Sequence, residues 1–401
     1  MLARLGSITS SGVVAVLVIT ALAAAPPAGA TNAHASSRAV CPAPLTGHTH
    51  CHALVVTDTN GNPSVTALPS GYGPAQFHGA YSLPTTAANN QTIAIVDAYN
   101  DPTAKADLDT FDSTFGLPAF PACGGSVTTS CFQKVNQNGN ASPLPRKNAG
   151  WALEISLDVQ VAHEICQDCK ILLVEAKSNS FSNLAAAVNT AANLGASVIS
   201  NSYGGSDTSP MSAYNHQGIA ITASSGDGGY GVESPASFNT VVAVGGTTLS
   251  LGANDSYGGE TVWSGAGSGC SSLNAAQVFQ KTAAGWSATG CGTKRGVADV
   301  AADADPQTGA AVYDSTAYQG RTGWFQVGGT SLSAPLIAAV FALAGNSATA
   351  NYSASLPYGN TGALHDVKSG TNGSCSTTMC AGAPGYDGPT GVGTPSGTGG
   401  F

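Results

Sequence analysis

The segment Trp151–Asp158, WALEISLD, places two carboxylates four positions apart among apolar residues. Residues four apart on a helix point in nearly the same direction, so we expect Glu154 and Asp158 to lie side by side. Only 9% of the chain is charged, which makes two adjacent like charges unexpected. Two such carboxylates can share one proton, so that one acts as a base while the other orients it. The alternative interpretation is a solvated helix edge with ordinary charges.

Ser331 lies in the segment Val327–Gly345, VGGTSLSAPLIAAVFALAG, directly after a turn of small residues and before an apolar helix. Glycine lets a substrate approach the backbone closely, and a helix N-terminus offers free N–H groups to a developing anion. Ser331 is therefore a candidate nucleophile, with helix capping as the alternative.

A serine nucleophile needs a base, and the base is ordinarily a histidine. His163 lies on the same expected helix as Glu154 but about 180° around its axis, so it should face elsewhere. The carboxylate pair of Glu154 and Asp158 is the remaining candidate for deprotonating Ser331.

Asp227 lies in the segment ASSGDGG, a glycine-rich turn that follows an apolar strand. Turn chemistry alone explains an aspartate followed by glycine. A protonated Asp227 would also donate a hydrogen bond to an oxyanion, and this requirement points to acid conditions.

The chain alternates between apolar, β-branched segments and segments with a helical pattern, and these elements must position the residues described above. This alternation predicts an α/β fold with a mainly parallel sheet covered by helices on both faces. Ligands of such sheets bind beyond the carboxyl ends of the strands, where Asp97, Asn201–Tyr203 and Ser224–Asp227 are expected. We expect strands in 92–99, 170–176, 196–205, 219–229 and 240–246, and helices in 101–115, 151–165 and 181–195.

Three motifs resemble those of the sedolisins, the serine-carboxyl peptidases with a subtilisin-like fold. They are the E-x-x-x-D helix, SSGDGG and GGTSLSAP, which follow one another along the chain in the order of that family. The resemblance extends over residues 71–401. It implies a three-layer subtilisin-like fold, protein or peptide substrates and an acid-active endopeptidase. It also implies that Ser331 is the nucleophile, Glu154 the general base, Asp158 the support of Glu154 and Asp227 the oxyanion partner. Ser333 is a rival nucleophile, but the family places its serine directly after Gly-Thr.

The C-terminal segment HDVKSGTNG to GYDGPTGVGTP, about 365–390, resembles the calcium loop of the same family. Hard cations prefer oxygen ligands, which aspartates and the carbonyl groups of tight turns supply. The resemblance implies one structural Ca²⁺ ion; a Gly/Asp-rich turn clipped by a disulfide is the alternative. The implied ligands are the side chains of Asp366 and Asp387 and the carbonyl groups of Val367, Ala383 and Gly385.

The overall charge and the N-terminal segment limit the partners and the location of the protein. The net charge is −9 and no basic cluster occurs, which argues against nucleic acid as a partner. Residues 1–30 have the pattern of a secretory signal peptide, and no later segment is apolar enough to span a membrane. We therefore expect a secreted, extracellular protein, and we expect it to be a monomer.

Ten cysteines agree with export to an oxidising compartment. They fall into five sequence-local pairs, and pairing between neighbours would clip loops without crossing the core. A zinc or redox role for Cys166 and Cys169 is the alternative to a small disulfide at a helix end. The pairs are Cys41/Cys51, Cys123/Cys131, Cys166/Cys169, Cys270/Cys291 and Cys375/Cys380.

Residues 31–70 are expected to form a short leader ahead of the catalytic domain of residues 71–401. Its histidines, His48, His50 and His52, could form a metal-binding tract. A solvated, disulfide-closed leader is the favoured interpretation, because no acidic partner is evident nearby in the sequence.

Two other functions remain open from the sequence. One is a histidine-dependent subtilisin-type peptidase that uses Asp97 and works at neutral to alkaline pH. The other is a non-catalytic exported binding protein that retains the scaffold.

Overall fold

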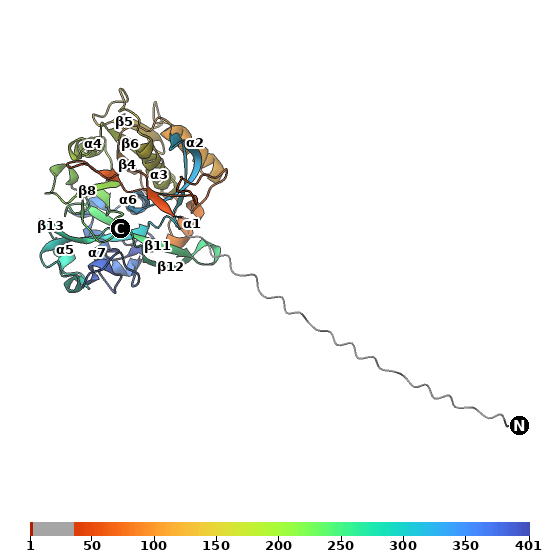
Figure 1. The fold of residues 1–401 in the computed structure, drawn as a ribbon. Helices are drawn as coiled ribbons and strands as arrows, with labels where there is room; N and C mark the ends of the chain where they lie inside the picture. The colour runs from red at the N-terminus through yellow and green to blue at the C-terminus, as the bar shows by residue number, and fades with distance from the viewer. Residues whose placement is uncertain (3–35) are drawn as a thin grey trace. The chain divides into compact units, whose positions relative to one another are not determined.

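The structure is a computed structural model that describes residues 1, 2 and 36–401 (Figure 1). The predicted signal peptide, residues 1–30, lies outside the described residues apart from its first two positions. Within the described part of the chain, no helix is both long and apolar enough to cross a membrane.

An eight-stranded sheet forms the centre of the structure, in the order β12-β11-β9-β7-β4-β6-β5 with β15 also paired to β11. Its neighbouring strands run parallel, except that β11 and β12 are antiparallel. In both β4 and β6 every residue but the first is buried, as a sheet covered on both faces requires. The predicted subtilisin-like α/β fold is therefore confirmed. The strands of this sheet are β4 (Thr92–Ala98), β5 (Phe132–Asn136), β6 (Lys170–Ala176), β7 (Val198–Asn201), β9 (Ala220–Ser224), β11 (Val242–Leu251), β12 (Tyr257–Val262) and β15 (Val300–Asp303).

Helices flank the central sheet, and two of them are buried almost all round. In Figure 1, β4 and β6 lie between α4 and α3, and both helices pack against these strands. Helices α3 and α6 pack on one another, and nearly every residue of each is buried, which matches their apolar composition. The α-helices are α1 (Pro74–Tyr81), α2 (Ala104–Phe115), α3 (Ala149–Ile165), α4 (Phe181–Asn193), α5 (Val278–Lys281), α6 (Thr330–Ala344) and α7 (Ser355–Gly359). Short 3₁₀ turns are η1 (Ser212–Tyr214), η2 (Ala253–Asp255), η3 (Trp286–Thr289), η4 (Ser347–Thr349), η5 (Thr361–Ala363) and η6 (Thr378–Cys380).

The leader contributes three strands to smaller sheets of the same body. Strand β3 pairs with β17 on one side and with β1 on the other, while β2 pairs with β8. The expected boundary near residue 70 stays a prediction, since residues 37–56 already pair with strands of the catalytic part. The strands outside the central sheet are β1 (Ser37–Ala39), β2 (His50–Cys51), β3 (Leu54–Val56), β8 (Tyr203–Ser206), β10 (Glu233–Ser234), β13 (Gly269–Ala275), β14 (Lys294–Val297), β16 (Ala310–Tyr318), β17 (Arg321–Gly328), β18 (Leu364–His365) and β19 (Thr394–Pro395).

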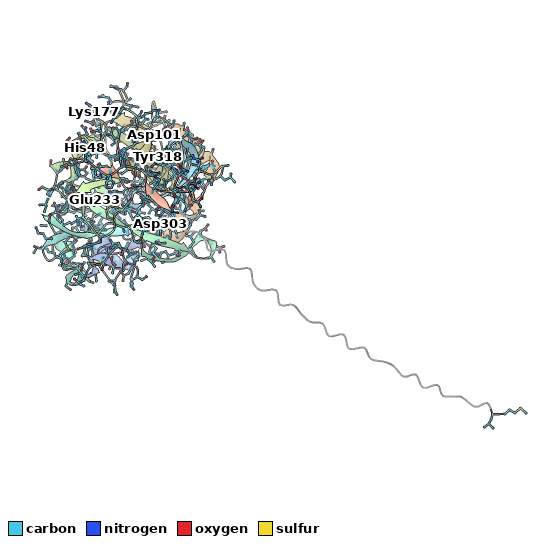
Figure 2. All side chains as sticks on the ribbon, in the orientation of Figure 1. His48, Asp101, Lys177, Glu233, Asp303 and Tyr318 are labelled. Atoms are coloured by element: carbon cyan, nitrogen blue, oxygen red, sulfur yellow. A yellow bond between two sulfur atoms is a disulfide. The ribbon has the colours of Figure 1, made fainter. Side chains whose placement is uncertain are left out.

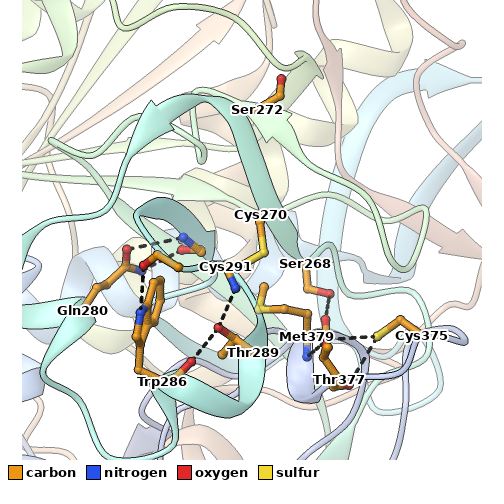
Figure 3. The surroundings of a disulfide bond; sticks show 12 residues. Ser268, Cys270, Ser272, Gln280, Trp286, Thr289, Cys291, Cys375, Thr377 and Met379 are labelled. Atoms are coloured by element: carbon orange, nitrogen blue, oxygen red, sulfur yellow. Dashed lines mark hydrogen bonds between the residues drawn. A yellow bond between two sulfur atoms is a disulfide. The ribbon is translucent and has the colours of Figure 1, made fainter.

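Five disulfides close local loops, and their connectivity confirms the pairing of neighbours. Figure 3 shows the surroundings of Cys270–Cys291, which ties β13 to the turn after η3. There the Cys291 N–H donates to the Thr289 hydroxyl at 3.2 Å, and that hydroxyl donates to the Trp286 carbonyl at 2.7 Å. The Cys166–Cys169 bridge directly follows α3, so it is the small disulfide at a helix end.

Candidate active site

Helix α3 carries Glu154 and Asp158 into the interior rather than to a solvated edge. Both side chains are fully buried, as are the apolar residues between them. The helix begins at a cap formed by Asn148, whose side chain accepts hydrogen bonds from the backbone N–H groups of Gly150 and Trp151. The solvated alternative for this pair is therefore wrong, because the helix is covered on all sides.

A third buried carboxylate, Asp97, faces this pair from the end of β4. No oxygen of Asp97, Glu154 or Asp158 is in full hydrogen-bond geometry with a described residue. Burial and then the charges of Asp158 and Asp97 hold the pKa of Glu154 well above its ordinary value. Burial and then Asp97 do the same to the pKa of Asp158, and burial raises the pKa of Asp97 to about 8. These carboxyl groups therefore keep protons to a higher pH than exposed carboxyl groups do, and the coupled pair of Glu154 and Asp158 can share one proton.

Ser331 lies in the first turn of α6, and its side chain faces Glu154. Hydrogen bonding to the Ser331 hydroxyl opposes the rise in the pKa of Glu154. In this structure the hydroxyl lies 3.3 Å from the Ser202 carbonyl oxygen, so its proton can turn either to that oxygen or to the carboxylate. Ser202 also interacts with Asp158 and lowers the pKa of that group. The structure thus brings the predicted nucleophile, base and supporting acid together.

Asp227 lies beside the start of α6. Its Oδ1 accepts hydrogen bonds from the Thr330 N–H at 2.7 Å and from the Thr330 hydroxyl at 2.9 Å. Its Oδ2 is buried without a hydrogen-bond partner among the described residues. Burial raises the pKa of Asp227 to about 6, against the lowering effects of His52 and Thr330. A protonated Oδ2 can therefore donate a hydrogen bond to a substrate, since it makes none to a described residue in this structure.

Gly329 makes room for the groups around the nucleophile. Its φ of 92° lies in the left-handed region that favours glycine. A Cβ there would lie 2.0 Å from the His52 carbonyl oxygen and 2.6 Å from Asp227 Oδ2. These two oxygens therefore approach the same point of the backbone, two residues before Ser331.

The other candidates from the sequence lie outside this arrangement. The Ser333 hydroxyl donates to the Thr330 carbonyl at 2.9 Å, within its own helix. His163 lies 3.3 Å from an oxygen of Asp112, and its ring packs against Phe120 with centroids 4.0 Å apart and an interplanar angle of 36°. His163 thus faces away from Ser331, as its position on the helix predicted.

The leader histidines do have an acidic partner, which corrects the expectation of a solvated leader. His50 Nε2 and His52 Nε2 lie 3.4 Å and 3.1 Å from the same oxygen of Glu233, and the His52 side chain is fully buried. Figure 2 labels Glu233 and the leader residue His48 on the side-chain view. Glu233 comes from β10, far along the chain, so sequence spacing gave no sign of it.

The predicted calcium loop brings its two aspartates to one turn. Asp366 accepts a hydrogen bond from the Gly385 N–H at 3.2 Å, and Asp387 accepts one from the Ala383 N–H at 2.9 Å. Burial raises the pKa of Asp387 to about 8, and the charge of Asp366 adds to the rise. Val367 is buried next to Asp366. Two mutually repelling carboxylates in one turn fit the preference of a hard cation for oxygen ligands.

A second acidic cluster joins Asp101, Asp107 and Asp314, and one carboxylate oxygen of each lies within 4.8 Å of the others (Asp101 is labelled in Figure 2). Hydroxyl groups of Thr103 and Thr316 donate to Asp101 at 3.0 Å and 3.2 Å. The cluster is a candidate for metal binding that the sequence did not suggest, because Asp314 lies far along the chain from Asp101 and Asp107.

Comparison with known proteins identifies the family. Residues 135–356 match the subtilase family, and the chain belongs to that family. Within it, the chain is a sedolisin-type protein with a subtilisin-like fold, as its relatives show. Sedolisin from Pseudomonas sp. (strain 101) is 29% identical over 370 residues, covering 81% of this chain and 60% of the relative. Kumamolisin from Bacillus sp. (strain MN-32) is 28% identical over 376 residues, covering 83% and 64%.

A solved structure gives the same result for the fold. Pseudomonas sedolisin, a serine-carboxyl proteinase complexed with two molecules of pseudo-iodotyrostatin, superimposes with a TM-score of 0.66 at 26% identity, over 82% of this chain and 96% of that one. The chain spans between 48% and 64% of the length of the curated relatives that it matches. Together these similarities show the subtilisin-like fold and the relation to sedolisins.

Proposed function

We propose that the protein is a secreted serine-carboxyl endopeptidase that hydrolyses peptide bonds in proteins at acid pH through an acyl-enzyme on Ser331. One observation carries the proposal: Ser331 faces buried carboxylates with raised pKa values rather than an imidazole ring. Such groups keep a shared proton in acid, where an ordinary histidine would be protonated and useless as a base. The family membership and the sedolisin relatives support the same reaction.

The reaction follows from the roles of four side chains. Ser331 Oγ attacks the substrate carbonyl while its proton passes to Glu154, whose charge Asp158 orients through a shared proton. The oxyanion accepts hydrogen bonds from protonated Asp227 and from the Ser331 N–H. Glu154 then protonates the leaving amine, and water hydrolyses the ester on Ser331 by the reverse proton transfers.

We also propose that Asp366, Asp387 and the carbonyl groups of Val367, Ala383 and Gly385 hold one structural Ca²⁺ ion. A bound cation would offset the repulsion between the two carboxylates and stabilise the C-terminal loops. The five disulfides and the signal-peptide pattern support export, and we propose that the exported protein acts as a monomer on proteins or peptides.

The test is hydrolysis of an unfolded protein at about pH 4 by the wild type and two variants. Ser331→Ala and Glu154→Gln should each abolish hydrolysis without loss of folded structure by circular dichroism. Ser333→Ala is the matched control and should retain activity, because Ser333 donates within its own helix. Substantial residual activity in either of the first two variants contradicts the assignment.

The two alternative functions make different predictions for the same assay. A histidine-dependent peptidase would work best at neutral to alkaline pH and would survive Glu154→Gln. A non-catalytic binding protein would show no turnover at any pH and no labelling of Ser331 by a peptide aldehyde or a fluorophosphonate probe.

A further inference from the structure

Three buried carboxylates outside the active site face one another where α2 packs against β16. Asp101 follows β4, Asp107 lies in the first turn of α2, and Asp314 lies on β16. Each of the three residues is 1% exposed or less. One carboxylate oxygen of each lies within 4.8 Å of the others. Two oxygen ligands on opposite sides of a Ca²⁺ ion are about 4.6–5.2 Å apart, so one ion can contact all three groups.

Asp314 brings an oxygen without a hydrogen-bond donor to this cluster. Its Oδ1 accepts a hydrogen bond from the Thr316 N–H at 2.7 Å. Its Oδ2 is buried and makes no hydrogen bond to a described residue. The charges of Asp101 and Asp107 act directly on this carboxylate, which faces them. A buried acceptor without a donor is costly, and a bound cation would remove that cost.

The other two carboxylates are held in place without being neutralised. Backbone N–H groups of Thr103 and Ser315 donate to Asp101 and Asp107, each at 3.0 Å. The Thr103 hydroxyl lies 3.0 Å from an oxygen of Asp101 and 2.6 Å from an oxygen of Asp107, but it has one proton for both. The cluster therefore combines fixed carboxylates with a hydroxyl oxygen, which are ligands that a hard cation accepts.

The nearby ammonium group of Lys134 does not balance this charge. It donates to the Asp101 carbonyl oxygen at 2.6 Å and lies 3.6 Å from the buried carboxylate of Glu175, so it is shared between Glu175 and the cluster. Burial raises the pKa of Asp101, and the charge of Lys134 opposes this rise only in part. Burial and then the charge of Asp101 raise the pKa of Asp314 to about 9. The cluster therefore needs further positive charge, from protons or from a metal ion.

We propose that Asp101, Asp107 and Asp314 bind a Ca²⁺ ion, separate from the C-terminal loop, that fastens the segment after β4 to the hairpin of β16 and β17. The observations behind it are the spacing of the three carboxylates, the unpartnered Asp314 oxygen and the sharing of Lys134 with Glu175. Calcium fits an enclosed site because it takes about six to eight oxygen ligands, whereas Mg²⁺ keeps several of its waters. The site does not depend on the proposed peptidase function.

The ion would join two segments that lead to the active site. Asp101 lies four residues after Asp97, at the end of β4. Asp314 pairs with Gly323 of β17, and that strand ends at Gly328, three residues before Ser331. The ion would therefore stabilise the body of the catalytic part.

The first experiment measures the metal content of the full chain at neutral pH, with Ser331→Ala as the parent so that self-digestion cannot interfere. The protein is produced in calcium-containing medium, dialysed without calcium and analysed by inductively coupled plasma mass spectrometry. The parent should retain Ca²⁺, because the three ligands are buried, whereas Asp366 of the C-terminal loop is exposed. Adding Asp314→Asn should leave one ion per chain fewer than in the parent.

Asp109→Asn is the matched control, because it removes an exposed carboxylate from the same helix α2. This variant should hold as much calcium as the parent. A parent without bound metal would mean that protons alone neutralise the cluster, and this result overturns the site. Bound Mg²⁺ in place of calcium, or an Asp314→Asn variant that keeps every ion of the parent, overturns it as well.

Hydrogen–deuterium exchange of the Ser331→Ala parent covers the case in which Asp314→Asn does not fold. After prolonged incubation with EDTA, exchange in residues 101–107 and 310–318 should become about tenfold faster or more. Added Ca²⁺ should restore the slow exchange, and added Mg²⁺ should not. Unchanged exchange in these segments, a change confined to residues 365–390, or equal recovery with Mg²⁺ overturns the site. Neither measurement uses peptide hydrolysis, so failure of the metal site leaves the peptidase function untouched, and the reverse also holds.

Discussion

Asp227→Asn is expected to extend activity toward neutral pH rather than abolish it. Asparagine keeps the Oδ1 acceptor for the two Thr330 hydrogen bonds and replaces the protonated Oδ2 with an N–H donor. That donor is present at every pH, whereas the oxygen of Asp227 carries a proton only below its pKa. The change therefore separates the donor function of this residue from its titration.

The size of the effect follows from the pKa of Asp227, which burial raises to about 6. Roughly 99% of this group is protonated at pH 4 and roughly 9% at pH 7, so this group alone lowers wild-type kcat/KM about tenfold over that range. Asp227→Asn should lack this loss. Asp227→Ala, which has no donor, should lose about 100-fold to 1,000-fold in kcat at pH 4, where the wild type is protonated, and less near pH 7.

The assay is a pH profile of kcat/KM for one fluorogenic peptide with the wild type and both variants. The expected result is a less steep decline between about pH 5 and 7 in Asp227→Asn than in the wild type. A variant that declines in parallel with the wild type, or is as inactive as Asp227→Ala, would refute the role of Asp227 as a protonated donor.

Three further predictions concern the carboxylates. Asp97→Asn should move the alkaline limb of the pH profile to lower pH, because its charge raises the pKa values of Glu154 and Asp158; an unmoved limb would contradict this coupling. The melting temperature should rise from pH 7 toward pH 4, because a raised folded-state pKa gives stability that is present in acid and lost as the pH rises through it. Glu164 is buried on α3, and burial raises its pKa, so it contributes to this trend. Glu164→Gln should therefore reduce the change of melting temperature with pH, as measured by differential scanning calorimetry. Calcium at 100 times its Kd should stabilise the wild type by about 2.7 kcal/mol and Asp387→Asn by much less; a melting temperature insensitive to chelation would rule out the site.

Local patterns in the sequence predicted much of the fold and the central chemistry. The helix that carries Glu154 and Asp158, the strand that carries Asp97 near its end and the turn before Ser331 all follow from spacing and apolar periodicity within a few residues. The five disulfides follow in the same way, since each joins neighbouring cysteines.

Contacts between distant segments could not be read from the sequence. The sequence predicts Asp97 at the ligand-binding edge of the sheet and, in one alternative, as the partner of a histidine. Its approach to Glu154 could not be predicted, because it depends on how β4 packs against α3. Glu233 contacts His52 although the two residues are 181 positions apart in the sequence, and the residues around one give no indication of the other. The packing of the leader could not be predicted either, because its strand β2 pairs with β8, which lies about 150 residues later in the chain.

The measurement that tests the central claim most directly is the pH profile of unfolded-protein hydrolysis by the wild type and Glu154→Gln, with the products sequenced. The account predicts a wild-type optimum in acid and no hydrolysis by Glu154→Gln at any pH. A neutral or alkaline optimum, with activity that persists in Glu154→Gln, would contradict catalysis by the buried carboxylates.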